Sequence, residues 1–283
     1  MSSLPGTPPH FTKEATMYLH NWFYQLQNID PRTVAKIDAD IKVIDYTSDG
    51  FTPFTKEQVA QMRGEPPARI VSYLSIGEAE DYRPYWKKVL DGTPPDWLGP
   101  TNPNWPGNLK VKFWLPGWKR IVMAQLDGII DAGFDGAYLD IIDGYEFWEK
   151  EYPNSATEML EFIKEIGDHA RKRNPEFLII PQNGESLISD THGKVLNYID
   201  GWAIEDLYYG DPDDGEPNSA ERTKERYSNI NQVLDDNKFV LLVEYPNATL
   251  TREAKVRAKV WDANGLTTYI TTRPLDKPTE PLQ

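Results

Sequence analysis

The sequence predicts an α/β fold, a single (β/α)8 or TIM barrel. Short apolar runs rich in β-branched and aromatic residues recur along the chain, and most precede a stretch with helical spacing. Nearly continuous apolar runs indicate strands buried on both faces, as in a parallel sheet covered by helices. A length of 283 residues suits one such barrel. The eight expected strands lie within residues 22–28, 41–50, 69–81, 136–145, 177–185, 201–211, 239–247 and 266–276.

Helical patterns are clearest in three of the segments between these strands, and we expect helices within residues 117–133, 154–174 and 251–265. The helix within 154–174 is predicted to begin with a capping box between Ser155 and Glu158. The helix within 251–265 has Thr251 as its predicted N-cap and Gly265 just past its end.

No repeat or domain-scale linker interrupts this alternation, so we expect one domain. The barrel is predicted over residues 13–278, with a flexible N-terminal tail at 1–12 and a C-terminal tail at 279–283. The irregular region is 91–120, between the third and fourth strands, which holds six prolines and four tryptophans. Long ordered loops usually have a function. We therefore expect this long Pro/Trp-rich insertion to fold over the barrel mouth, and a packing flap without a ligand role is the alternative.

The composition limits the classes of binding partner that we expect. Lys and Arg number 30 against 44 Asp and Glu, a net charge of -14. This charge argues against nucleic acid and suits a cationic substrate, although it also serves solubility alone. The chain has nine Trp and 15 Tyr, whose flat rings suit sugars or fill a core. Trp114 and Trp118 are the predicted sugar platforms, with packing as the alternative.

The chain has no cysteine, which excludes disulfides, thiolate nucleophiles and Cys-ligated metals. No apolar stretch of about 18 residues predicts a membrane span. The polar, Pro-rich start lacks the apolar core of a signal peptide. We expect a monomer that is secreted after removal of a leader, with a cytoplasmic location as the alternative.

Polar and acidic side chains follow several predicted strands at the point where each strand ends. The carboxyl ends of barrel strands meet at one rim, where active sites of this fold form. A single acid there is more often a helix cap or an ion-pair partner, but six strands share the pattern. Converging carboxylates raise one another's pKa, as a general acid requires. The residues are Asp45, Glu78, Glu80, Asp81, Asp140, Asp143, Gln182, Asn183, Glu185, Glu205, Asp206 and Glu244.

The residue types at this rim favour glycoside hydrolysis. That reaction needs two carboxylates about 5 to 10 Å apart, together with aromatic faces for the sugar. Only four histidines occur, none at a predicted strand end, which weakens Ser-His-Asp and zinc chemistry. Two alternatives stay open: a carbohydrate-binding barrel without turnover, and a metal-dependent hydrolase with the acids as oxygen ligands. For the glycosidase we expect neither a cofactor nor a metal.

Four stretches carry a family resemblance: VSYLSIGEAEDYRPYW (71–86), GFDGAYLDIIDGY (133–145), PQNGE (181–185) and AIEDLYY (203–209). They resemble glycoside hydrolase family 114, the endo-α-1,4-polygalactosaminidase group. The resemblance covers the chain from about Tyr18 to Asp276. It implies a TIM-barrel glycosidase that cleaves an α-linked amino-sugar polysaccharide, acting within an α-1,4-galactosamine-containing polymer.

The resemblance also assigns the chemistry to two acids. Asp140, which closes the fourth strand, matches the family's proposed catalytic Asp, and Glu205, which closes the sixth, matches the proposed catalytic Glu. Similarity to related α-glycosidase barrels implies that Asp140 is the nucleophile and Glu205 the general acid/base, with the reverse order open. These strand ends are two strands, roughly 10 Å, apart before the side chains reach inwards.

Other side chains are predicted to bind substrate around this pair. Asp143 is expected to bind a hydroxyl or amine or, alternatively, to hold Tyr145. The alternative for Glu78 is an ion pair with Arg83, and the alternative for Arg273 is to balance the acidic rim. The predicted substrate-binding set is Tyr24, Asp45, Tyr46, Glu78, Asp143, Gln182, Asn183, Glu185, Tyr208, Glu244, Arg273, Trp114 and Trp118.

Overall fold

A computed structural model describes residues 19–90, 92–210 and 213–282. The N-terminal tail predicted at 1–12 lies outside the described residues. Within the predicted C-terminal tail, the Thr279 carbonyl accepts a hydrogen bond from the Tyr269 hydroxyl at 2.8 Å. No helix in the described part of the chain is long and apolar enough to cross a membrane. The location of the protein and its oligomeric state stay predictions.

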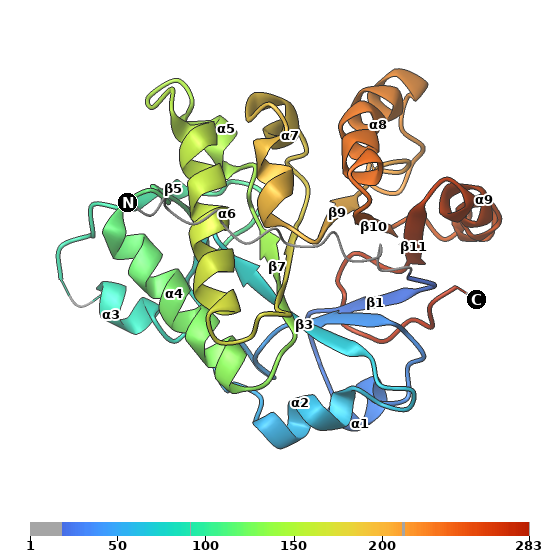
Figure 1. Ribbon diagram of the computed structural model, residues 1–283, viewed down its shortest axis with the longest axis horizontal. Coiled ribbons are helices and arrows are strands. Elements are labelled where there is room, and N and C mark those ends of the chain that lie inside the picture. Colours follow the sequence, from blue (N-terminus) through green and yellow to red (C-terminus); the bar gives the residue numbers. More distant parts are fainter. Residues whose placement is uncertain (1–18, 91, 211–212, 283) are drawn as a thin grey trace, which may run out of the picture.

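In the described residues, eight parallel strands form a barrel wall, which confirms the predicted TIM barrel. Each strand lies within a run predicted from the sequence, and Figure 1 shows the helices around them. The strands are Trp22–Gln25 (β1), Ile41–Ile44 (β2), Arg69–Ser75 (β3), Gly136–Asp140 (β7), Leu178–Pro181 (β8), Gly201–Glu205 (β9), Phe239–Glu244 (β10) and Leu266–Ile270 (β11).

The wall consists of two hydrogen-bonded sheets, in the orders β1-β2-β3-β7-β8 and β11-β10-β9. Two junctions join them. Between β8 and β9, Gln182 and Ala203 form a parallel bridge. At the other junction, the N–H groups of Leu26 and Gln27 both donate to the Leu275 carbonyl, each at 3.0 Å. The two junctions close the sheets into a barrel.

Side chains supply part of the ladder between β8 and β9. The Asp200 carboxylate accepts from the Ile179 N–H at 2.7 Å and is itself bound by Arg171 at 2.7 Å. Nearer the mouth, the Asn183 Oδ1 accepts from the Glu205 N–H at 2.8 Å. This junction therefore depends in part on particular side chains, as does the start of the β3–β7 pair, where Asp135 Oδ2 accepts from the Ile70 N–H at 2.8 Å.

The outer helices confirm the three predicted ones, but two of them start differently. Ser155 is the first helical residue, and the Glu158 carboxylate accepts from the Tyr152 hydroxyl (3.1 Å) instead of closing a capping box. Thr251 is inside its helix because the preceding residue is already in the helical region, and Gly265 follows the end as predicted. The helices are Pro31–Val34 (α1), Lys56–Met62 (α2), Trp86–Leu90 (α3), Pro116–Asp131 (α4), Gly144–Trp148 (α5), Ser155–Arg171 (α6), Ser186–Asp190 (α7), Ala220–Asp235 (α8), Thr251–Ala263 (α9) and the 3-10 helix Lys194–Tyr198.

The insertion forms a small antiparallel sheet together with a strand that precedes it. The insertion supplies Leu98–Thr101 (β5) and Asn108–Val111 (β6), and the preceding strand is Glu78–Glu80 (β4), in the order β4-β6-β5. The Val111 carbonyl accepts from the Trp148 indole N–H of α5 at 2.9 Å. The sheet is thus attached just after β3 and to α5, at the rim where the barrel strands end.

Candidate active site

Two acids face the barrel mouth, each held by a tyrosine from a neighbouring strand. Asp140 ends β7 and Glu205 ends β9. The Tyr73 hydroxyl on β3 donates to Asp140 Oδ2 at 2.7 Å. The Tyr245 hydroxyl, just after β10, donates to Glu205 Oε1 at 2.5 Å. Both acidic residues are partly exposed, so a substrate can reach them.

The electrostatic environment favours one proton on this pair of acids. Burial, and then the negative charge of Glu205, raises the pKa of Asp140 to about 8. Burial also raises the pKa of Glu205, although the hydrogen bonds from Tyr245 and Asn183 lower it. The pair therefore retains a proton near neutral pH. Burial raises the pKa of both Tyr73 and Tyr245 well above the usual range, so both hydroxyls stay protonated donors.

Asn183 positions Glu205 through two hydrogen bonds. Its Nδ2 donates to Glu205 Oε2 at 3.3 Å, and its Oδ1 accepts from the Glu205 N–H at 2.8 Å. Asn183 has a φ of +53°, in the left-handed region that Asn tolerates better than most residues. At the next position, Gly184, a Cβ would lie 2.9 Å from the Asp143 nitrogen. The turn after β8 therefore requires these two residue types.

Tyr24 and Gln182 form the floor beneath the pair, and each is only 2% exposed. The Tyr24 ring lies 5.2 Å from the Tyr138 ring. Burial raises the pKa of Tyr24 well above the usual range, and the nearby charges of Glu205 and Asp140 add to the effect. The Gln182 Oε1 has no hydrogen-bond partner among the described residues. A ligand would therefore meet these two residues only at the bottom of the mouth.

Asp45 belongs to a buried ion-pair cluster next to the mouth. The Arg83 guanidinium, whose side chain is 1% exposed, binds Asp45 at 2.9 and 2.7 Å and Glu80 at 2.8 Å. The rings of Tyr46 and Tyr73 lie 5.2 and 6.0 Å from its central carbon. The cluster thus supports Tyr73, the residue that holds Asp140. Sequence reasoning missed Tyr73, because a tyrosine inside an apolar strand has the pattern of a core residue.

Glu78 does not form the ion pair with Arg83 that was the alternative to its predicted role in substrate binding. Glu78 is fully buried, and its carboxylate binds Lys110 at 2.8 Å, Asn102 at 2.9 Å and Asn108 at 3.1 Å. All three partners belong to the insertion. Glu78 therefore joins the strands of the small sheet and has no oxygen turned to a sugar in the mouth.

Glu244 and Tyr208 lie in the outer layer. Tyr245 faces the mouth, so strand alternation turns Glu244 the other way. Its buried carboxylate accepts from the backbone N–H groups of Tyr208 at 2.9 Å and Tyr209 at 3.1 Å. The Tyr208 ring stacks on Trp261 of α9, with centroids 4.1 Å apart and planes at 5°. Neither side chain makes a hydrogen bond to Asp140 or Glu205 among the contacts of the described residues.

Asp143 stays exposed at the mouth, as a substrate-binding role requires. Desolvation by the surrounding protein raises the pKa of its carboxyl, although the positive charge of Lys110 lowers it. The alternative role of holding Tyr145 is wrong, because the Tyr145 hydroxyl donates to Asp190 at 2.6 Å. The carboxylate is thus available to a hydroxyl or amine.

Glu185 and Arg273 are held in ion pairs. Arg226 Nε donates to Glu185 at 2.5 Å. Arg273 donates to both Asp206 oxygens, at 3.0 and 2.9 Å, and its central carbon lies 4.5 Å from the centre of the Tyr245 ring. Arg273 therefore balances rim charge, the alternative expected for it, and also packs on the tyrosine that holds Glu205.

Neither predicted tryptophan platform faces the mouth. Trp118 is fully buried, and its indole N–H donates to the Ile76 carbonyl at 2.7 Å. Trp114 stacks on Tyr152 at 4.6 Å and lines a groove on the outside of α4 and α6. Apolar pattern alone does not distinguish exposed rings from buried ones. The exposed aromatic side chains on segments that follow strands β2, β3 and β7 are Phe51, Tyr82, Trp105 and Phe147.

The mouth therefore presents paired carboxylates. Asp140 and Glu205 project from β7 and β9, with β8 between them, and two-carboxylate glycoside hydrolysis uses acids on either side of the bond it cleaves. In the ranges that the structure describes, no three His, Asp or Glu side chains are grouped so that they could hold a metal ion.

Comparison with known proteins decides the family. The sequence profile of glycoside-hydrolase family GH114 matches residues 6–281. The chain belongs to family GH114. It is therefore a glycosidase. Among GH114-like relatives, an uncharacterised protein of Methanocaldococcus jannaschii is 45% identical over 242 residues, 82% of this chain and 68% of the relative. One of Deinococcus radiodurans is 35% identical over 280 residues, 97% and 87% of the two chains.

Solved structures share the fold of this GH114 chain. Aspergillus fumigatus Ega3, in complex with galactosamine, superposes with a TM-score of 0.71 at 19% identity, over 95% of this chain and 98% of Ega3. The glycoside hydrolase domain of PelA from Pseudomonas aeruginosa gives a TM-score of 0.74 at 12% identity, over 93% and 99% of the chains. At these identities the likeness shows the TIM-barrel fold that GH114 chains use.

Proposed function

We propose that this GH114 chain hydrolyses an α-linked amino-sugar polysaccharide and cuts within α-1,4-linked, galactosamine-containing chains. The observation that carries the proposal is the pair Asp140 and Glu205, two partly exposed carboxylates at the mouth, each bound by a tyrosine hydroxyl. The substrate class is supported by the galactosamine in the Ega3 complex. It is also supported by the net charge of -14, which attracts a cationic polymer.

In the proposed double displacement, the Asp140 carboxylate attacks the anomeric carbon while Glu205 gives its proton to the departing glycosidic oxygen. The first sugar fragment leaves, and the second is bound covalently to Asp140. Glu205, now ionised, takes a proton from a water molecule whose oxygen displaces Asp140. The product then keeps the original anomeric configuration. Tyr73 and Tyr245 orient the two carboxylates throughout.

One observation favours the reverse order of roles. The pKa of Asp140, raised to about 8 by burial and by Glu205, keeps the proton on Asp140 in the free enzyme. A general acid needs such a pKa.

Removing the Tyr245 hydroxyl with Tyr245→Phe is expected to raise the pKa of Glu205, because that hydrogen bond lowers it. Because Asp140 keeps the proton in the free enzyme, Glu205 has the lower pKa and sets the acidic limb of kcat/KM. This limb is expected to move up by about one pH unit, since a hydrogen bond to a charged group contributes about 1.5 kcal/mol. Tyr73→Phe is expected to move the basic limb up, because its hydroxyl lowers the pKa of Asp140.

These shifts test the pair and not the order of roles, because the acidic limb follows the lower pKa whichever acid is the nucleophile. An unchanged profile in both variants contradicts the catalytic pair. Tyr145→Phe is the control, because that hydroxyl is bound to Asp190. It is expected to move neither limb.

Oligosaccharides of α-1,4-galactosamine with free amines are expected to be cleaved at least about tenfold faster, in kcat/KM, than their N-acetylated forms. The acidic protein attracts the cationic chain, and added salt reduces the difference by screening. Mass spectrometry of the products distinguishes internal from terminal cleavage. Faster turnover of the neutral, N-acetylated oligosaccharide contradicts attraction of a cationic substrate by the acidic protein. Binding without cleavage of either oligosaccharide indicates a carbohydrate-binding barrel.

A further inference from the structure

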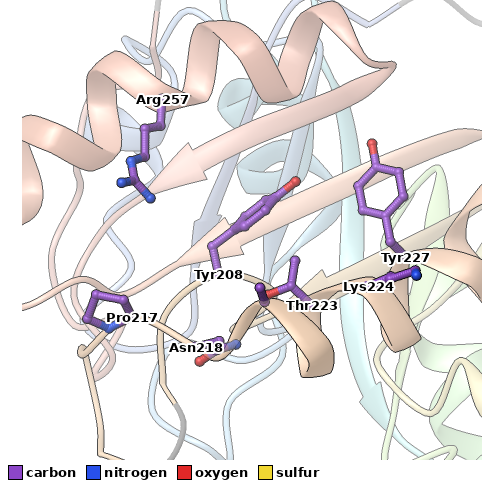
Figure 2. A pocket seen from close by; sticks show the side chains of 8 residues that line it. Tyr208, Pro217, Asn218, Thr223, Lys224, Tyr227 and Arg257 are labelled. Carbon is purple, nitrogen blue, oxygen red and sulfur yellow. The ribbon is translucent and has the colours of Figure 1, made fainter.

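A cavity of about 440 Å³ lies between α8 and α9. Figure 2 shows Tyr208 between Arg257 on one side and Tyr227 on the other, with Thr223 and Asn218 near its base. Tyr208 follows Glu205 by three residues, a reach of at most about 10 Å along the chain. The cavity is therefore separate from the mouth but adjoins the segment that carries a catalytic acid.

Tyr208 offers an aromatic face of the kind that binds sugars. Trp261 covers one side of its ring at 4.1 Å, while the residue stays partly exposed and lines the cavity. Glu244 also binds its backbone N–H at 2.9 Å. Tyr227, likewise partly exposed, adds a second ring to the lining. Because Tyr208 is already fixed, stacking a pyranose on it costs little conformational entropy.

The charges of the cavity differ from those of the mouth. Its charged lining residues are Lys224 and Arg257, with no carboxylate among the described lining residues. Arg257 Nη2 pairs with Glu253 at 2.6 Å, and both side chains are about half exposed, at 53% and 51%. Lys224 and Arg257 therefore give the lining its N–H donors, since the Asn218 Nδ2 already donates to two backbone carbonyls. They suit hydroxyl, carbonyl or carboxylate oxygens and disfavour a protonated amine.

Hydrogen bonds hold the α8 wall of the cavity against the catalytic segment. The Thr223 hydroxyl donates to the Leu207 carbonyl at 3.1 Å. One turn further along α8, Arg226 donates to the Glu205 carbonyl at 2.8 Å. The cavity thus keeps a fixed position relative to Glu205.

We propose that this cavity is a second saccharide-binding subsite, which takes a pyranose unit without positive charge, either N-acylated or acidic. The inference rests on the proposed function, because it takes the same polysaccharide as the ligand. A chain bound at both places carries a free amine at the mouth and an N-acyl or carboxylate-bearing unit on Tyr208. The subsite thereby selects mixed polymers over uniformly cationic ones.

Titration calorimetry in the Asp140→Asn background tests the subsite without turnover. The probes are octasaccharides of α-1,4-galactosamine, N-acetylated or free, together with the free-amine disaccharide. Tyr227→Ala and Lys224→Glu are expected to weaken binding of the N-acetylated octasaccharide at least fivefold. Binding of the free-amine disaccharide, which suits the mouth and is too short to span both places, stays unchanged. Lys224→Glu is also expected to strengthen binding of the free-amine octasaccharide.

Two control variants make the same chemical changes elsewhere. Tyr152→Ala removes a partly exposed tyrosine that stacks on Trp114, and Lys172→Glu reverses an exposed charge at the end of α6. Both are expected to leave every Kd within twofold. If the two cavity variants also stay within twofold for every octasaccharide, the subsite is overturned.

Further comparisons identify the sugar and separate this inference from the proposed hydrolysis. Tighter binding of α-1,4-galacturonic acid octasaccharide than of the N-acetylated one assigns an acidic unit, and the reverse assigns an N-acyl unit. Loss of free-amine binding in Lys224→Glu overturns the charge argument. Loss of N-acetylated binding in the cavity variants, without cleavage of any probe by the wild type, retains the subsite and rejects the hydrolysis. Cleavage of a probe by the wild type, together with unaffected binding in the cavity variants, rejects the subsite and retains the hydrolysis.

Discussion

Asp140→Asn is expected to lower kcat for α-1,4-galactosamine oligosaccharides by about 10⁴-fold, because an amide neither attacks the anomeric carbon nor protonates the leaving oxygen. The loss is expected under either order of roles. Asn keeps the shape of the side chain and an oxygen that accepts from the Tyr73 hydroxyl. Substrate binding is therefore retained. Glu205→Gln is expected to give a similar loss, and the release of reducing ends measures both.

The fold of the Asp140→Asn variant is expected to remain intact, and pH provides the check. Since burial and Glu205 raise the pKa of Asp140 to about 8, the folded state binds this proton more tightly than the unfolded chain. The stability that the protonated Asp140 contributes to the wild type is therefore fully present below a pH of about 4 and is lost as the pH rises through about 8. Asn has no such charge. The variant is expected to unfold at the same temperature as wild type at pH 8, or at a higher one.

Added azide identifies the nucleophile in smaller variants. Azide enters the site emptied by Asp140→Gly and gives a β-glycosyl azide if Asp140 is the nucleophile. In Glu205→Gly it attacks the covalent intermediate and gives the α-glycosyl azide. The opposite products show the reverse roles. Hydrolysis at the wild-type rate in either variant contradicts the pair.

Arg83→Met is expected to lower the free energy of unfolding by about 3 to 5 kcal/mol. The guanidinium, with a side chain 1% exposed, is bound to both Asp45 and Glu80. Without it, two buried carboxylates face each other with no cation between them. The Tyr73 ring also loses its contact with the guanidinium, so activity falls with stability. Urea unfolding measures the change.

Compensating changes test this explanation. Adding Asp45→Asn and Glu80→Gln to Arg83→Met removes the unpaired charges and is expected to recover a large part of the loss. Arg32→Met, at a side chain 79% exposed, is the control and is expected to have little effect. A loss below about 1 kcal/mol for Arg83→Met contradicts a buried charge cluster, since that is the size of a surface pair.

The barrel could be predicted because strands buried on both faces leave continuous apolar runs. Phe239–Glu244, for example, is buried at every position. Helix starts were less predictable, since Glu158 bonds to Tyr152, a partner that a local motif does not reveal. The small sheet of the insertion was also not predicted. Its strands pair across turns, and the buried Glu78 takes partners 24 to 32 positions away in the chain.

The position of the proposed catalytic pair was predictable to the extent that both acids end barrel strands. The direction in which the neighbouring side chains point was not predictable. Glu244 and Tyr245 are adjacent in the sequence but lie on opposite faces, and only the strand register determines which of them enters the mouth. Asp45 appeared available to substrate, yet Arg83, 38 residues away, occupies both of its oxygens. Sequence patterns identify the ends of strands, whereas ion pairs between residues far apart in the sequence determine which of the acids there are accessible to substrate.

The junction between β8 and β9 has a mechanical consequence. Asp140 stands on one sheet and Glu205 on the other, so the junction runs between the two carboxylates. Part of its ladder comes from the side chains of Asn183 and Asp200. A hinge movement at this junction changes the gap between the acids directly. Replacing either side chain is therefore expected to loosen the junction and to change the separation of the acids.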